Sequence, residues 1–299
     1  MKPGTRERLT SDLFLFLAAA IWGLGFVAQR LATRHLSFFG FNAIRFLLGG
    51  LVLLPFVLKG FGSLRKTYGW VLAAGFVLFL ASTLQQAGMA STTAGAAGFI
   101  TGIYVVLVPV FLALFWRRKT TIVTWIAVAA SFFGTWLLST GGKMEALSAG
   151  NLLILGGAFL WALHVIVVGL AVQRMDAFAF SACQFLLAGS LHLLMSFLFG
   201  PLTSAAIRLA WLPLVYASLF SVVLGFTFQA LGQRKAPASD AALLLSLESV
   251  FAALSGAVFL TETMSALQWL GCAIILAAVL FAQLAGSSPS VPRETVLSE

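Results

Sequence analysis

Apolar runs separated by short polar stretches cover the chain from residue 13 to residue 285. A membrane-spanning helix needs about 20 mostly apolar residues, because each residue adds about 1.5 Å across a hydrocarbon core about 30 Å thick. Ten runs have roughly this length: residues 13–33, 38–58, 69–90, 94–116, 121–140, 151–171, 177–199, 211–232, 238–260 and 265–285. The pattern predicts an all-α integral membrane protein with ten transmembrane helices.

The two ends of the chain differ from the apolar runs. Residues 1–12 are basic and precede an apolar stretch, as in a signal peptide, but the run continues to Ala28 without a small-residue cleavage pattern. We therefore expect a cytoplasmic N-terminus followed by an uncleaved first helix. Residues 286–299 are polar, contain Pro289 and Pro292, and are predicted to form a disordered cytoplasmic tail.

Composition excludes the other broad classes of protein. The 299 residues are 61% hydrophobic and only 9% charged, whereas soluble domains are about a quarter charged. So few charges cannot cover the surface of a soluble, disordered or fibrous protein of this size. In a soluble protein, a net charge of +9 would indicate binding to nucleic acid. Here the basic residues lie in short loops between apolar runs, so we expect a lipid bilayer and no nucleic acid as partner.

The basic residues are divided unequally between the two sets of alternating loops. One set and the termini hold thirteen: Lys2, Arg6, Arg8, Lys59, Arg65, Lys66, Arg117, Arg118, Lys119, Arg174, Arg234, Lys235 and Arg293. The other set holds four: Arg30, Arg34, Lys143 and Arg208. Because cytoplasmic loops carry an excess of Lys and Arg, both termini are predicted to lie in the cytoplasm, with the chain in a bacterial-type inner membrane.

The second half of the chain resembles the first. An offset of 139 residues places Trp161 on Trp22 and aligns Gln184-Phe185-Leu186-Leu187 with Arg45-Phe46-Leu47-Leu48. Each half contains five spans, and because five is odd the second half enters the membrane from the opposite side. Such inverted repeats are used by secondary transporters, which bind substrate near the midplane.

We therefore predict two inverted five-helix repeats, residues 13–140 and 151–285, around a central cavity. The runs 121–140 and 265–285 have almost no polar residues in their interiors. They are expected at the periphery or in an oligomer contact, so the protein would be a monomer or a homodimer.

Two segments resemble the EamA family of the drug/metabolite transporter superfamily. Ala20-Ile21-Trp22-Gly23 through Ile44-Arg45-Phe46-Leu47-Leu48 is similar to its opening. Leu247-Glu248-Ser249-Val250-Phe251-Ala252-Ala253-Leu254, with Thr261-Glu262 and Leu270-Gly271, is similar to the end of its second repeat. Ser249 replaces the usual Pro, and Arg118 replaces the acidic residue that Glu262 matches. The resemblance implies a transporter, and a general likeness to YddG-type exporters suggests amino acids, aromatic ones included, as cargo.

Two ionisable residues lie deep in the predicted spans. Arg45 is about seven residues into its span, and Glu248 is about ten residues into its own, close to the midplane. A charge at the centre of a single span costs roughly 2.5–3.5 kcal/mol, so each needs a partner or water. The pair could clamp a substrate carboxylate and ammonium. Alternatively, Arg45 and Glu248 could form a structural ion pair, or each could form hydrogen bonds to helix ends separately. These alternatives remain open from the sequence.

Further polar and aromatic residues are candidates for a cavity wall. They are Trp22, Trp161, His164, Gln85, Gln86, Gln229, Tyr104 and Ser246. Each amide in a span must face protein or a wet cavity, because hydrocarbon offers no hydrogen-bond partner. Helix packing is the alternative for the tryptophans and for His164, and His192 is more typical of packing. Pro109 is expected to kink its span and to act as a hinge.

The same residues argue against other functions. An intramembrane enzyme needs a cluster of metal ligands or a nucleophile with a base, and Glu248 with the separated His164 and His192 does not form one. No cofactor, metal ion or ATP-binding loop is expected. Cys183 and Cys272 lie in apolar runs and are predicted to be unpaired. The favoured prediction is an amino-acid exporter, whose partner is a small-molecule substrate. Two alternatives remain: an uncoupled facilitator or channel, and an exporter of drugs or other metabolites.

Overall fold

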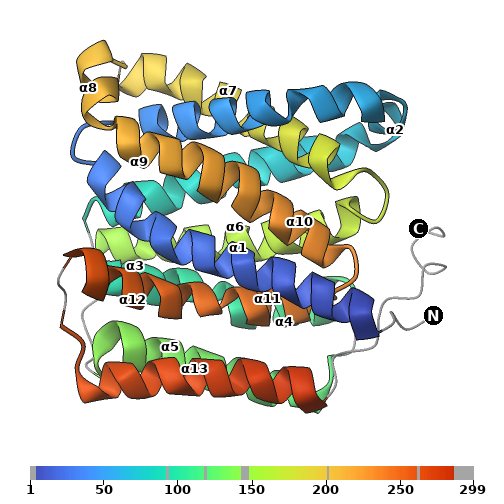
Figure 1. The fold of residues 1–299 in the computed structure, drawn as a ribbon, viewed down its shortest axis with the longest axis vertical. Helices are drawn as coiled ribbons and strands as arrows, with labels where there is room; N and C mark the ends of the chain where they lie inside the picture. Colours follow the sequence, from blue (N-terminus) through green and yellow to red (C-terminus); the bar gives the residue numbers. More distant parts are fainter. Residues whose placement is uncertain are drawn as a thin grey trace.

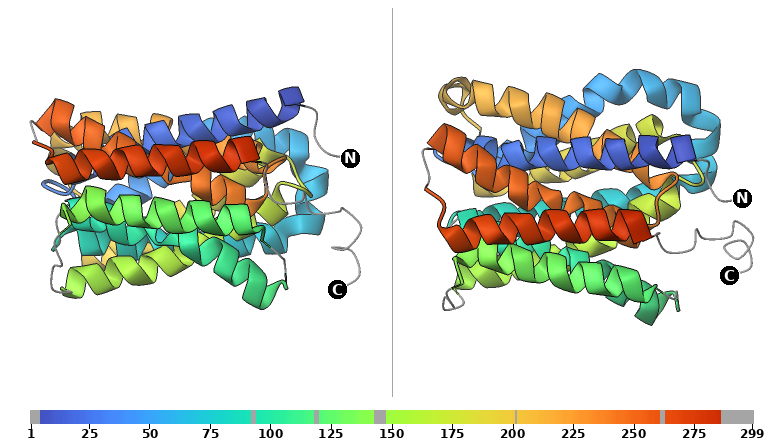
Figure 2. Two further views of the ribbon diagram at one scale, coloured as in Figure 1. Left: turned by 90° about the horizontal axis from the view of Figure 1, so that it is seen from below. Right: turned by 60° about the horizontal axis from the view of Figure 1, so that its bottom comes forward.

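The computed structural model describes residues 5–91, 94–117, 120–142, 148–200, 202–260 and 263–285. Every regular element in these ranges is a helix, and the helices lie side by side in one bundle (Figures 1 and 2). The N-terminal residues 1–4, the tail 286–299, and Arg118 and Glu262 of the family resemblance lie outside the described residues. Cys183 and Cys272 are unpaired, as predicted.

The described residues up to Thr140 form α1 (Thr5–Ala32), α2 (Phe38–Met89), α3 (Ala94–Gly102), α4 (Tyr104–Phe115) and α5 (Ile122–Thr140). The remainder of the described chain forms α6 (Ala149–Ala171), α7 (Ala177–Phe199), α8 (Ser204–Leu209), α9 (Trp211–Val215), the π-helix η1 (Tyr216–Phe226), α10 (Thr227–Gln233), α11 (Ala238–Leu245), α12 (Leu247–Leu260) and α13 (Ala266–Ala285).

Among the described residues, eight helical segments are long and apolar enough to cross a membrane. They are Glu7–Ala32, Phe38–Val57, Thr67–Met89, Ala149–Ala171, Ala177–Phe199, Trp211–Gln233, Ala238–Phe259 and Ala266–Ala285. Two shorter apolar helices, Ile100–Phe115 and Ile122–Leu138, occupy the remaining predicted spans. The protein is therefore an all-helical, multi-pass membrane protein, while the count of ten crossing helices stays a prediction.

Helix α2 differs from the sequence prediction because it is continuous over two predicted spans. Its 52 residues would measure about 78 Å if straight, far more than a membrane core of about 30 Å. In Figure 1 the ribbon of α2 bends back on itself, and its two apolar parts, Phe38–Val57 and Thr67–Met89, are the separate spans. Continuous helix thus joins two spans that the sequence predicts to be separated by a short loop.

Three breaks in regular α-helix lie in the interior of predicted spans. Ile103 separates α3 from α4, and Ser246 separates α11 from α12. Between α9 and α10 the backbone has π-helical geometry over Tyr216–Phe226. Pro109 lies inside α4, so the interruption of this span occurs six residues before the proline. A hinge at Pro109 stays a prediction.

Helices α5 and α13 pack against each other at one edge of the bundle (Figures 1 and 2). The two backbones approach closely where glycines meet, because a Cβ on Gly271 would lie 2.5 Å from the carbonyl oxygen of Gly134. This arrangement agrees with the expected peripheral place of the two spans. An oligomer contact there stays a prediction.

Candidate functional site

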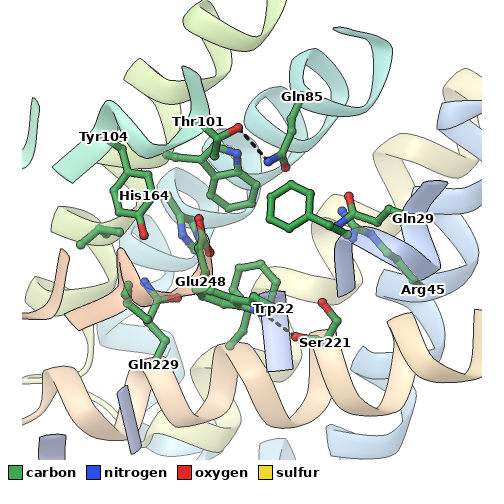
Figure 3. A pocket seen from close by; sticks show the side chains of 15 residues that line it. Trp22, Gln29, Arg45, Gln85, Thr101, Tyr104, His164, Ser221, Gln229 and Glu248 are labelled. Atoms are coloured by element: carbon green, nitrogen blue, oxygen red, sulfur yellow. Dashed lines mark hydrogen bonds between the residues drawn. The ribbon is translucent and has the colours of Figure 1, made fainter. Parts of the chain in front are cut away.

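A pocket lies in the interior of the bundle between the two halves of the chain (Figure 3). Its lining residues are Trp22, Phe26, Gln29, Arg45, Gln85, Thr101, Tyr104, Trp161, His164, Val165, Ser221, Phe226, Gln229, Leu245 and Glu248. The cavity volume is about 60 Å³. One water molecule needs roughly 10–15 Å³ measured in this way, so the pocket has room for several.

The structure brings eight of the ten predicted cavity residues into this wall. They are Trp22, Arg45, Gln85, Tyr104, Trp161, His164, Gln229 and Glu248. Gln86 is buried beside Gln85 but outside the pocket, since consecutive helical residues point in different directions. Ser246 donates to the carbonyl of Leu243 at 2.6 Å and lies 2.9 Å from the hydroxyl of Ser131, so it packs between helices.

Several pocket residues were not among the sequence candidates. Gln29 follows Trp22 by seven residues and therefore lies on the same face of α1, a spacing that could have identified it. Thr101 accepts a hydrogen bond from Nε2 of Gln85 at 3.2 Å. Ser221 and Phe226 belong to η1, and Phe226 carries no polar signal that would distinguish it from other apolar residues in its run.

The two tryptophans act both as cavity wall and in packing. Phe226 lies between them, with ring centroids 4.8 Å from Trp22 and 6.0 Å from Trp161. The indole N–H of Trp22 donates to the carbonyl of Ser221 at 3.0 Å. The indole N–H of Trp161 is buried and has no hydrogen-bond partner among the described residues. The two equivalent positions therefore differ in their hydrogen bonding.

Arg45 is almost completely buried, with 3% of its surface exposed. Its guanidinium carbon lies 5.0 Å from the ring centroid of Phe41 and 4.6 Å from that of Phe46, so the cation is stabilised by aromatic faces. Within the described part of the chain, no ion pair joins Arg45 to Glu248, and Figure 3 places the two side chains in different parts of the pocket. The structural ion pair considered from the sequence is not formed.

The two buried histidines have different surroundings. Nε2 of His164 lies 2.9 Å from Oε1 of Gln184, and because a carbonyl oxygen only accepts, this nitrogen donates. His192 lies outside the pocket, where Nδ1 donates to the carbonyl of Ala188 at 2.8 Å and Nε2 lies 3.1 Å from the hydroxyl of Thr83. His192 is therefore a hydrogen-bonded packing residue, and His164 belongs to the pocket wall.

The pocket wall contains buried polar atoms that have no hydrogen-bond partner in the described part of the chain. They are Oε1 of Gln29, Nε of Arg45, the hydroxyl of Tyr104, Nε1 of Trp161, Nδ1 of His164 and Oε1 of Gln229. An unsatisfied buried polar group costs about 1–3 kcal/mol, so a water or a polar molecule bound at these atoms would stabilise this wall. No group of three or more His, Cys, Asp or Glu suited to a metal ion occurs among the residues described.

Similarity to known proteins assigns the chain to a family. The EamA-like transporter family model matches residues 9–140 and again residues 148–283. An uncharacterized transporter of Archaeoglobus fulgidus is 31% identical over 286 residues, which are 93% of this chain and 87% of that protein. The threonine/homoserine exporter RhtA of Escherichia coli is 29% identical over 197 residues, which are 64% of this chain and 62% of RhtA.

A solved crystal structure of a protein shares the fold, with a TM-score of 0.77 and 19% identity over 92% of this chain and 96% of its own. The similarity to YddG-type exporters stays a prediction. The resemblance of the two sequence segments to EamA proteins is confirmed by the family match over both halves. The chain belongs to the EamA-like transporter family and is a membrane transporter.

Proposed function

We propose that the protein is a secondary transporter that exports amino acids, aromatic ones included, or similar small metabolites across the inner membrane. The observation that carries this proposal is the central pocket, whose wall combines apolar rings with buried polar atoms that lack partners. Such a wall suits a small molecule with both apolar and polar parts. The similarity to RhtA, an exporter of threonine and homoserine, supports amino acids as cargo.

The proposed mechanism is alternating access of two inverted repeats, residues 13–140 and 151–285. The family model matches the chain twice, which supports an internal repeat. In Figure 1, α3 and α4 follow each other from left to right, whereas α11 and α12 follow each other from right to left. The breaks at Ile103 and Ser246 lie in these two spans. Equivalent broken helices of opposite direction are a feature of transporters built from inverted repeats.

Contacts join α1 to α10 and to the residues that follow it at one end of the bundle. Ser11 of α1 donates to the carbonyl of Gly232 at 2.5 Å, and Lys235 lies 3.4 Å from the carboxylate of Glu7. At the other end of α1, Gln29 lines the pocket only three residues before the helix ends. This asymmetry supports a conformation closed on the side of the basic loops. An exporter must separate these contacts to admit cargo from the cytoplasm.

Counter-flow into proteoliposomes tests the proposal. Vesicles preloaded with unlabelled threonine, homoserine or an aromatic amino acid should take up the labelled compound, and the rate should saturate with concentration. Arg45→Ala and Glu248→Ala should lower the rate strongly, whereas Ser181→Ala removes a buried hydroxyl outside the pocket and should not. A flux that rises without saturation would identify a channel, and no exchange of any amino acid would contradict the proposed cargo.

A further inference from the structure

Two groups of polar side chains lie on different sides of the pocket. Figure 3 shows Tyr104, His164, Gln229 and Glu248 together on one side and Gln29 with Arg45 on the other. The first group contributes mainly hydrogen-bond acceptors, whereas the second contains Arg45, which only donates, beside the unpartnered Oε1 of Gln29. A cargo molecule therefore meets two chemically different surfaces in one cavity.

Glu248 is the charged centre of the first group. It lies in the first turn of α12 and is 7% exposed. Among the residues that the structure describes, none forms an ion pair or hydrogen bond with its carboxylate. Arg45, by contrast, lies over the rings of Phe41 and Phe46. A carboxylate in a membrane needs a cation or protic partner, and at this position a bound molecule can supply it.

The neighbours of Glu248 add further acceptors. Oε1 of Gln229 is buried without a partner in the described chain. His164 donates through Nε2 to Gln184, so in the neutral ring Nδ1 is the acceptor, and this atom is also without a partner there. The hydroxyl of Tyr104 is buried and unpartnered in the same way, and it can accept as well as donate.

We propose that Glu248, Gln229 and His164, with Tyr104 beside them, form an ammonium subsite that binds the primary amino group of the cargo. This rests on the proposed transport function and names the chemical group that the site selects. A primary ammonium offers three N–H donors, which match three acceptors, and hydrogen bonds between charged groups are the strongest kind in proteins. Gln184 acts as a positioning residue. Its hydrogen bond to Nε2 of His164 keeps the lone pair of Nδ1 of His164 directed away from Gln184.

The separation of Glu248 from Arg45 changes the clamp inferred from the sequence. In an α-amino acid the ammonium and carboxylate are joined through one carbon, so a cargo held at Glu248 keeps its carboxylate close to the ammonium subsite. The amino group is then the recognised feature. A methylated or acylated nitrogen would lose N–H donors and leave buried acceptors unpaired, which costs binding.

Competition between matched compounds tests the subsite. Counter-flow of labelled threonine is measured in the presence of three unlabelled competitors. They are threonine, its N,N,N-trimethyl derivative, and the hydroxy acid in which a hydroxyl group replaces the amino group. We expect the free amine to compete at least about tenfold more strongly than the other two. Equal inhibition by the three compounds would overturn the subsite while leaving amino-acid transport intact.

Variants separate the subsite from folding. Gln229→Leu and His164→Leu should each reduce the preference for the free amine, and His164→Asn, whose amide oxygen can occupy the position of Nδ1, should restore part of it. Ser181→Ala should keep the full preference. If Glu248→Gln folds, it should lose most of the preference, and an unchanged preference in Glu248→Gln or in both leucine variants would overturn the proposal. If wild-type protein exchanges ethanolamine but no amino acid, the cargo proposal fails and the ammonium subsite stands.

Discussion

At the scale of single residues, Gly23 controls how closely α1 approaches α12. A Cβ at this position would lie 2.8 Å from the amide nitrogen of Ala252 and from the carbonyl oxygen of Glu248, and it would also overlap Cβ of Phe251. The hydroxyl of Ser255 adds a 3.3 Å hydrogen bond to the carbonyl of Gly23. The glycine therefore allows the contact that brings Trp22 and Glu248 into one wall.

Gly23→Ala should destabilise the protein, because the new methyl group meets backbone atoms that cannot move without shifting a helix. We expect a loss of about 1–3 kcal/mol in unfolding free energy, visible as a lower Tm of the detergent-purified protein, together with weaker transport. Gly98→Ala is the matched control, since nothing lies within 4 Å of its Cβ position. It should raise stability by about 0.4–1 kcal/mol. Equal Tm values for the two variants would contradict the close approach of α1 to α12 at Gly23.

The sequence identifies some pocket residues more easily than others, for a physical reason. Arg45 and Glu248 stand out because an ion inside an apolar run is costly and rare. Phe226 is equally central, yet one more aromatic residue among 28 phenylalanines carries no such signal. The relation of Arg45 to Glu248 depends on how helices far apart in sequence pack, so the sequence left an ion pair open and the structure was needed to exclude it.

At the scale of helices, hydropathy predicts where spans begin and end but not the hydrogen-bond pattern inside them. The predicted run 177–199 and α7 coincide, whereas the run 211–232 contains the π-helix η1. Apolar composition does not distinguish i→i+4 from i→i+5 bonding, and π-helical turns often lie at functional sites. Here η1 contributes Ser221 and Phe226 to the pocket.

Trp22→Phe should loosen η1, because it removes the N–H that donates to the carbonyl of Ser221. We expect a stability loss of about 0.5–1.5 kcal/mol from this bond and faster hydrogen exchange in peptides covering Tyr216–Phe226. Trp161→Phe is the control, since that indole N–H has no partner in the described chain. It should leave exchange in η1 unchanged and act on transport instead. Similar exchange in both variants would exclude a special role for the Trp22 bond.

At the scale of the whole molecule, the loops at the two ends of the bundle carry different charge. The described residues Arg174, Arg234 and Lys235 lie in the connections that follow α6 and α10, at the end of the bundle where α1 begins (Figure 1). Arg30, Arg34 and Arg208 lie at the opposite end. The positive-inside rule predicts that the first end faces the cytoplasm. The direction of export in the proposed mechanism depends on this orientation.

Cysteine labelling in intact cells tests the orientation. Cys183 and Cys272 are the two native cysteines, and replacing both by Ala gives a background for single cysteines at the exposed positions Arg34, Arg208 and Lys235. A membrane-impermeant maleimide should label Arg34→Cys and Arg208→Cys directly, but Lys235→Cys only after the cells are permeabilised. The reverse labelling pattern would show that the protein has the opposite orientation in the membrane. The contacts of Ser11 and Lys235 would then close the external side, and the pocket would be reached from the cytoplasm.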